Sequence, residues 1–190
     1  PRIYKTEAIV LKQIAIGEAD RLLTFYTVDM GKVRAVAKGV RRMTSRIGGH
    51  LELLNQISIS LAQGRNLDVV TEAQTIRGFR GFRQDLGKLS KAMYLAELVH
   101  DFSAESLSNQ PIYHLLLDAL CRLDTTDHSD LLLRFFELRL MDYSGFRPEL
   151  FRCVECRINL APDNHSFSCA KGGVLCMRCR ASSNEAMVLL

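Results

Sequence analysis

The strongest constraint on this chain is a pair of cysteine motifs in its last forty residues or so. Cys153-x2-Cys156 is followed, after nineteen intervening residues, by Cys176-x2-Cys179. Each C-x-x-C turns the backbone so that two sulfurs face one ion, and two such knuckles together close a tetrahedron. Four thiolates leave no position for water or substrate, so the spacing predicts one structural zinc ion and not a catalytic one.

Other interpretations of the cysteines have less support. A redox C-x-x-C should stand at a helix N-terminus beside a βαβ pattern, which the surrounding sequence lacks. Cys169 and His165 lie between the knuckles, but neither has a partner at knuckle spacing, so both are predicted to be bystanders. Cys121, in a predicted helix, is expected to be a buried, inert thiol.

The N-terminal part of the chain alternates β-rich runs with turn signals, which is typical of a small all-β unit. Five strands are predicted, at residues 6–13, 21–28, 32–39, 51–63 and 67–78. Five strands suit a small barrel such as the OB-fold better than a sandwich, which usually needs about seven or more. An SH3-like barrel remains an alternative.

From about residue 84 the apolar period changes from two to about 3.6, which indicates helices. They are predicted at 87–102, from Pro111 onward, and at 131–143, the last apolar around most of its circumference and so expected at the centre of a bundle. The predicted class is α+β: an OB-fold domain at 1–82, then a helical domain at 83–190 with the zinc module at 153–179.

Charge is distributed unevenly along the chain. Residues 1–85 carry fourteen Lys/Arg against eight Asp/Glu, a net of +6, whereas residues 86–190 carry eleven against thirteen, a net of −2. A concentrated positive field favours phosphate-rich partners, although a purely solubilising role stays open.

The basic residues gather in the segment "KGVRRMTSRIGG" (38–49), between the third and fourth predicted strands. With no acid among them, they can neutralise phosphates without reading bases. A solvated basic loop is the alternative, and an OB-type barrel favours the nucleic-acid interpretation. The candidate DNA-binding residues are Lys12, Arg34, Lys38, Arg41, Arg42 and Arg46.

Base stacking has less support than backbone contact, because core filling is the usual role of strand aromatics such as Tyr4, Phe25, Tyr26, Phe79 and Phe82. The chain has no phosphate-binding G-x-x-x-x-G-K-[ST], no H-E-x-x-H and no G-x-S-x-G, so no catalytic residue and no small-molecule substrate are predicted. It also lacks a signal peptide and an apolar run of membrane-spanning length, so a cytoplasmic protein is expected.

The order of a basic barrel, helices and a four-cysteine module resembles the RecO family of bacterial recombination mediators. "TEAIVLKQIAIGEADRLLTFYTVDMGKVRAVAKGVRR" is similar to the family's N-terminal stretch, and "GFRPELFRCVEC" with "FSCAKGGVLCMRC" is similar to its zinc segment. Family members normally continue into further helices after the second knuckle, whereas this sequence stops soon after it, so a fragment or a trimmed chain is expected.

The resemblance implies a non-enzymatic protein that binds single- and double-stranded DNA, anneals complementary strands and helps to load RecA in recombinational repair. The implied partners are RecR and the single-strand-binding protein, at the bacterial nucleoid. Lys38, Arg41, Arg42 and Arg46 match the family's DNA-facing region, and Cys153, Cys156, Cys176 and Cys179 match its metal ligands. An alternative is a zinc-ribbon and barrel scaffold that binds only protein.

Overall fold

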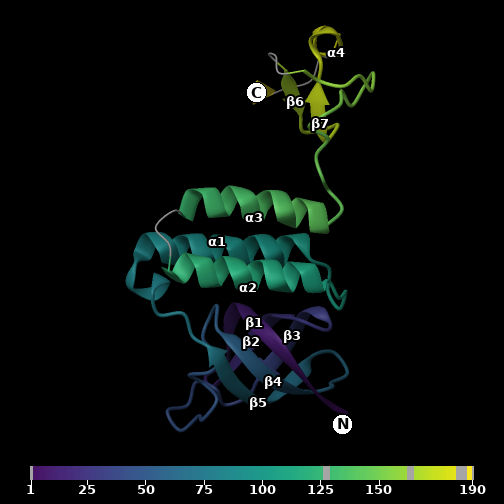
Figure 1. Cartoon of the computed structure of the whole chain (residues 1–190). Coiled ribbons are helices and arrows are strands. Elements are labelled where there is room, and N and C mark those ends of the chain that lie inside the picture. Colours follow the sequence, from purple (N-terminus) through teal and green to yellow (C-terminus); the bar gives the residue numbers. More distant parts are fainter. Residues whose placement is uncertain (1, 126–128, 162–164, 183–187, 190) are drawn as a thin grey trace. The chain divides into compact units, whose positions relative to one another are not determined.

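The computed structural model describes residues 2–125, 129–161, 165–182 and 188–189. They form two compact units, residues 1–140 and residues 141–190. The first unit contains a barrel with helices packed on it, and the second is built around the cysteine motifs (Figure 1). The domain boundary predicted between residues 82 and 83 follows the change of period and not this division, and it stays a prediction.

The barrel is closed, with strand order β1-β2-β3-β5-β4. Its strands are β1 (Ile3–Ile16), β2 (Asp20–Thr27), β3 (Gly31–Ala37), β4 (Gln56–Ala62) and β5 (Asp68–Arg77). All pairings are antiparallel except the short parallel contact that closes the barrel, where Ala35 and Val36 of β3 face Asp68 and Val69 of β5. This architecture confirms the predicted five-stranded barrel of OB type.

Strand β1 is buried on both faces along its middle. Ala8 and Val10 point into the barrel interior, whereas Ile9 and Leu11 belong to the cluster that the helices cover. A bulge shifts the register between Val10 and Lys12, so the alternation restarts and Lys12 is exposed directly after buried Leu11. The strand extends beyond the predicted 6–13 because β4 pairs with its first half and β2 with its second.

The connection from β3 to β4 contains the largest departure from the predicted strands. A strand was expected from residue 51, but β4 begins at Gln56. Leu51 and Leu54 are both fully buried, and Leu54 has a left-handed backbone with φ of 68°. Leu51 packs into the barrel core, and Leu54 packs into the core between the barrel and the helices. The apolar residues of this segment therefore fill two separate cores and do not form the buried face of a strand.

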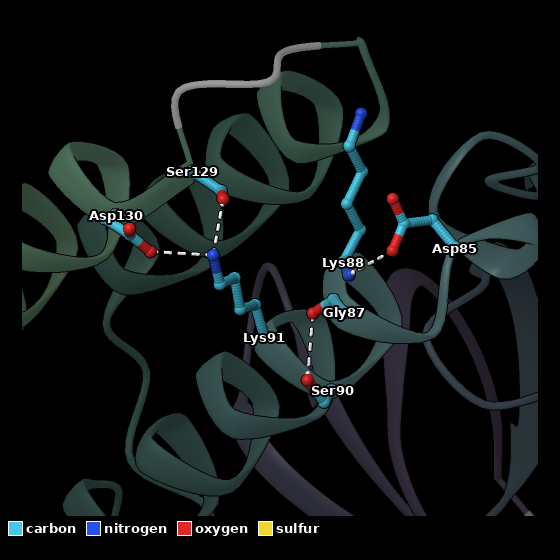
Figure 2. Close-up of polar contacts among 7 residues, drawn as sticks. All are labelled: Asp85, Gly87, Lys88, Ser90, Lys91, Ser129 and Asp130. Carbon is cyan, nitrogen blue, oxygen red and sulfur yellow. Dashed lines mark hydrogen bonds and ion pairs between the residues drawn. The ribbon is translucent and has the colours of Figure 1, made fainter.

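The helical part of the first unit contains the 3-10 turn η1 (Phe82–Gln84) and the helices α1 (Leu86–Phe102), α2 (Gln110–Thr125) and α3 (Ser129–Tyr143). Helices α1 and α2 pack on the barrel, and α3 lies on their other side (Figure 1). One apolar cluster joins these layers, and it includes Tyr26 of β2 together with residues of all three helices. Asp85 caps α1 by accepting a hydrogen bond from the Lys88 backbone N–H at 3.1 Å (Figure 2).

Lys91 joins α1 to the start of α3. Its Nζ donates to Ser129 Oγ at 2.6 Å and to Asp130 Oδ1 at 2.7 Å (Figure 2). A cation beside a helix N-terminus is unfavourable on its own, and the carboxylate of Asp130 offsets that effect. The contact fixes where α3 begins relative to α1.

Helix α3 is not the central helix that its composition predicted. Its buried apolar residues are Leu133, Phe136 and Leu140, which lie on one face. On another face the side chains are exposed, with Leu131 at 77% and Phe135 at 50%. Apolar residues all round a helix predict burial all round, and among the described residues nothing covers this second face.

The segment between α1 and α2 runs beside β3. The Ser106 backbone N–H donates to the Lys32 carbonyl at 2.9 Å, and Lys32 Nζ donates to the His100 carbonyl at 2.7 Å. Gly31, with φ of +67°, allows this approach, because a Cβ there would lie 2.0 Å from the Leu107 carbonyl oxygen. The helices are thereby attached to the edge of β3.

The second unit contains β6 (Ser166–Ser168), β7 (Gly173–Leu175), α4 (Met177–Ala181) and β8 (Val188–Leu189), with sheet order β7-β6-β8. Gly172, with φ of +67°, lies in the turn between β6 and β7, as expected for a turn that leads into the second knuckle. In the described part of the chain, none of the helices has the length and apolar character required to cross a bilayer.

Candidate metal centre and nucleic-acid interface

The four knuckle cysteines lie together in the second unit. The sulfurs of Cys153, Cys156, Cys176 and Cys179 all lie within 4.8 Å of one another. The Cys156 and Cys176 sulfurs are 3.7 Å apart, and a tetrahedral ion with Zn–S bonds of about 2.3 Å requires sulfur separations of about 3.8 Å. The residues present therefore fit a four-coordinate, thiolate-bound metal.

The two knuckles share one type of backbone hydrogen bond. The Arg157 N–H donates to the Cys153 carbonyl at 2.9 Å, and the Arg180 N–H donates to the Cys176 carbonyl at 2.9 Å. Arg157 has a left-handed backbone, with φ of 63°, in the first knuckle. The Cys176 N–H also points at the Cys153 sulfur, 3.4 Å away, so each knuckle helps to place the other.

The thiols differ in acidity. Burial raises the pKa of Cys153, but hydrogen bonds from the backbones of Cys156, Cys176 and Glu155 outweigh it, and the pKa falls to about 6. Burial, together with hydrogen bonds to the other three thiols, raises the pKa of Cys179 to about 12. Several thiolates this close repel one another, and a divalent cation is what allows all four to ionise.

Glu149 organises the chain that enters the first knuckle. Its Oε1 accepts hydrogen bonds from the backbone N–H groups of Phe151 at 2.9 Å and Arg152 at 3.1 Å. These bonds, that of Phe151 first, hold the pKa of Glu149 below its ordinary value. Its carbonyl accepts from the Val174 N–H at 2.9 Å, so Glu149 connects the two knuckles. These contacts explain physically why the segment "GFRPEL", which contains Glu149, directly precedes the first knuckle.

The remaining cysteines lie elsewhere. Cys169 is exposed in the turn between β6 and β7 and is outside the four-sulfur cluster. His165 is bonded to the Ala161 carbonyl at 2.6 Å. Cys121 on α2 is half-buried and not fully buried as expected, and its sulfur accepts a hydrogen bond from Arg77 at the end of β5.

On the barrel, two of the predicted DNA-binding residues share one row of the outer face. Lys12 of β1 pairs with Thr24 of β2, which pairs with Arg34 of β3. Neighbouring strands are about 4.8 Å apart, so Lys12 and Arg34 stand about 10 Å apart at their backbones. Arg34 forms an ion pair with Glu105 at 2.9 Å, so part of its charge is already balanced within the protein.

Lys38, Arg41 and Arg42 lie at one end of the same barrel. The Arg41 N–H donates to the Ala19 carbonyl at 2.9 Å, and its side chain donates to the Gly17 carbonyl at 3.0 Å. These bonds hold the start of the basic segment against the turn between β1 and β2. All three side chains are exposed.

Arg46 is placed apart from the other predicted cations. It lines a groove of about 460 Å³ over the outer faces of β1, β4 and β5. The lining side chains that carry charge or hydrogen-bonding groups include Lys5, Arg46, His50, Ser58, Glu72 and Gln74. Lys5 was missed from the sequence because the first strand was expected to begin at residue 6. Its place in the alternation of Ile3, Lys5 and Glu7 was the available signal.

Most of the aromatic residues considered for base stacking fill cores, as expected. Phe25, Tyr26, Phe79 and Phe82 are at most 1% exposed. Tyr4 is half-buried, and its hydroxyl donates to Asp68. These rings are therefore not placed for stacking on bases.

The chain matches two family descriptions along most of its length. Residues 2–79 match "Recombination protein O N terminal", and residues 83–190 match "Recombination protein O C terminal". Among curated proteins named "DNA repair protein RecO", that of Dehalococcoides mccartyi strain 195 is 40% identical over 180 residues, which cover 95% of this chain and 71% of that protein.

The similarity extends to other bacteria. The protein of that name from Roseiflexus sp. strain RS-1 is 40% identical over 98% of this chain and 65% of its own length. That from Desulforudis audaxviator strain MP104C is 43% identical over 93% of this chain and 70% of its own length. The chain therefore belongs to the RecO family of DNA repair proteins.

Proposed function

We propose that this chain is a non-enzymatic recombination mediator. It binds single- and double-stranded DNA, anneals complementary strands and assists the loading of RecA during recombinational repair, in the bacterial cytoplasm at the nucleoid. Its membership of the RecO family supports this role. The observation that carries the proposal is the exposed cationic surface of the barrel, made by Lys12, Arg34, Lys38, Arg41 and Arg42, with Arg46 in the groove.

The proposed mechanism is electrostatic. Lys and Arg side chains hold the phosphate backbone, which leaves the bases available for pairing. Neutralising phosphates lowers the repulsion between two strands, so annealing needs no step in which a covalent bond is made or broken. Because the aromatic rings of the barrel strands lie in cores or are half-buried, this binding should depend little on base sequence.

The test is a titration of single-stranded DNA, followed by fluorescence anisotropy at several salt concentrations. Each phosphate contact contributes about −0.7 to the slope of log affinity against log salt. The triple variant Arg41→Ala/Arg42→Ala/Arg46→Ala should flatten the slope by about 2 and slow strand annealing. An unchanged slope would move the DNA site elsewhere.

A matched control removes the same charge from the helices. Arg122 and Arg134 are paired with acids of their own helices, and Arg139 lies 5.6 Å from the centre of the Phe135 ring. Replacing these three with Ala changes the net charge equally and should leave the slope close to that of the unaltered protein. No binding of unaltered protein at low salt would favour the protein-only scaffold instead.

We also propose that the four-thiol centre holds one structural zinc ion through Cys153, Cys156, Cys176 and Cys179. The fit of the sulfur separations to tetrahedral geometry supports this. When bound, the ion would crosslink the two knuckles of a small unit that has only a small apolar core. Metal analysis of purified protein should give one zinc per chain, and a metal-free protein with free thiols or disulfides would favour a redox role.

RecR and the single-strand-binding protein are the proposed protein partners. The support is family membership, together with exposed apolar side chains on α3 such as Leu131 and Phe135, which are suited to a partner's short peptide. Co-elution of the chain with each partner in size-exclusion chromatography tests this. Separate elution at micromolar concentration would remove that partner from the proposal.

A further inference from the structure

The groove over β1, β4 and β5 is a second polar surface of the barrel, at a different place from the row of Lys12 and Arg34. Because the closed order is β1-β2-β3-β5-β4, the row crosses β1, β2 and β3, and the groove lies over the other side of the barrel wall. Its volume of about 460 Å³ is within the range of about 300–1,000 Å³ common for ligand sites. It is large enough for one nucleotide unit but not for a duplex.

The strand register sets the order of groups along the groove. Lys5, Ser60 and Glu72 form one cross-strand row, and Glu7, Ser58 and Gln74 form the next. The Glu7 carboxylate accepts hydrogen bonds from Gln56 and Tyr113 and is not part of the groove lining. Two residues along a strand span about 7 Å. Within the groove, the charged side chains of the first row therefore lie one step from the Ser58 hydroxyl and the Gln74 amide, which matches the order of phosphate and base edge in a nucleotide.

Several of the lining groups are available to a ligand. Among the described residues, Lys5, Arg46, Ser58 and Gln74 have no side-chain hydrogen-bond or ion-pair partner. Lys5 and Gln74 are exposed, so a ligand need not displace an internal contact to reach them. Lys and Arg supply donors for phosphate, whereas a hydroxyl and an amide both donate and accept, as base edges require.

His50 adds a hydrogen-bond donor to the groove lining, and its contacts with Thr75 indicate which ring nitrogen carries the proton. The Thr75 backbone N–H donates to His50 Nδ1 at 3.2 Å, and the Thr75 hydroxyl lies 2.9 Å from the same atom. Nδ1 therefore acts as the acceptor, and the proton of the neutral imidazole resides on Nε2. The ring is held at the groove as an Nε2–H donor.

Glu72 is the only acid among the described residues that line the groove. Its Oε2 accepts a hydrogen bond from Ser60 Oγ at 3.1 Å. Its carboxylate opposes a phosphate that approaches Lys5 in the same row, so the two side chains should have opposite effects on anion binding. If Lys5 and Glu72 had only structural roles, their substitutions would not change anion binding in opposite directions.

We propose that this groove is a subsite for a single nucleotide unit of unpaired DNA, with the phosphate against Lys5, Arg46 and His50 and the base edge against Ser58 and Gln74. The proposal rests on the proposed DNA-binding function and adds a location and a set of contacts to it. A duplex presents no free Watson–Crick edge, so the subsite favours single strands over double strands.

The experiment measures anisotropy of labelled oligothymidylate of about 16 nucleotides, the upper site size of one OB-fold. Lys5→Ala should weaken binding about three- to tenfold at low salt and flatten the salt slope by about 0.7. Gln74→Ala should weaken binding without changing the slope, because an amide releases no counterion. Glu72→Gln should strengthen binding about two- to fivefold.

Arg80→Ala is the matched control, since Arg80 is an exposed cation on the segment between β5 and η1, outside both surfaces. If Lys5→Ala behaves as Arg80→Ala does and Glu72→Gln changes nothing, the groove is not a DNA subsite. The wider proposal would still stand if substitutions of Arg41 and Arg42, which lie outside the groove, flatten the slope. Failure of the unaltered protein to bind oligothymidylate would overturn both.

Thymidine monophosphate serves as a second probe. Binding of the mononucleotide as tight as that of the oligomer would identify a small-molecule nucleotide site and overturn the polynucleotide subsite. Much weaker binding of the mononucleotide, still reduced by Lys5→Ala, would support the subsite as one contact among several along a strand.

Discussion

The two units of this protein reach a defined structure by different physical means. The first unit has extended apolar cores, with fully buried residues such as Phe25 inside the barrel and Phe136 on the buried face of α3. In the second unit the buried apolar cluster contains Cys153, Leu175 and Cys176, so two of its three members are proposed metal ligands. The first unit can depend on hydrophobic burial, whereas we expect the second to depend on the proposed metal as a crosslink.

The two units also differ in whether they offer a surface that a ligand could bind. The four-cysteine centre is a closed set of sulfurs, which leaves no coordination position for a substrate. Among the described residues, the barrel carries cations without an acidic partner, such as Lys12 and Lys38, and a polar groove lies on its outer surface. In the proposed function, the cysteine motif therefore serves stability, and the basic residues of the barrel are the ones that bind a ligand.

Removal of the metal should have the largest effect and should separate the two units. Structural zinc contributes about 10–16 kcal/mol of binding free energy near pH 7, so a strong chelator should unfold the second unit. The first unit should keep its own thermal transition in circular dichroism. Retention of both transitions after complete removal of zinc would break the contrast between the units.

Single cysteine substitutions refine this prediction. Cys176→Ser should lose metal and the second unit's transition, because it removes a ligand from the cluster. Cys169→Ser is the matched control and should keep one zinc per chain, since Cys169 lies exposed in a turn. Release of zinc by Cys169→Ser would mean that the ligands are wrongly assigned.

Truncation of the barrel core should have the next largest effect and should act on the first unit alone. Phe25 is fully buried among the side chains of the barrel interior. Phe25→Ala should cost about 3–5 kcal/mol in the free energy of unfolding, measured by urea denaturation. Ile14→Ala is the control on the same barrel, because Ile14 is 47% exposed and should change stability by less than about 0.5 kcal/mol.

Loss of Glu149 should destabilise the second unit by less than loss of the metal. Glu149→Ala removes the acceptor of the Phe151 and Arg152 N–H groups and should lower the second unit's melting temperature, while Glu149→Gln should retain part of the effect. The pKa of Glu149 is lowered on folding from 4.5. Its contribution is therefore present above pH 4.5 and is lost as the pH falls through the lower, folded pKa.

The smallest predicted effect concerns the ion pair between Arg34 and Glu105. Both side chains are about half-exposed, so the pair should contribute about 0–1 kcal/mol to stability. Glu105→Gln should leave the melting temperature nearly unchanged and should raise affinity for single-stranded DNA a few-fold, because Arg34 becomes available to phosphate. An unchanged affinity would remove Arg34 from the proposed interface.

Much of the architecture could be predicted from local sequence patterns. The alternation of β-rich runs and turns gave the five strands, and the spacing of Cys153, Cys156, Cys176 and Cys179 gave a four-sulfur cluster. The failures occurred where non-local burial decides conformation. Leu51 and Leu54 read as part of a strand but fill two different cores, and α3 reads as central but exposes Leu131.

The sequence by itself determined the metal-ligand spacing, the barrel class and the excess of cations in the first half, because each depends on residues close together in the chain. Only the tertiary structure decided how those cations are grouped. Strand register places Lys12 beside Arg34, a contact from the distant segment pairs Arg34 with Glu105, and the path of the β3–β4 connection carries Arg46 to the groove with Lys5. Such groupings follow from how strands and connections pack together, which local periodicity does not encode.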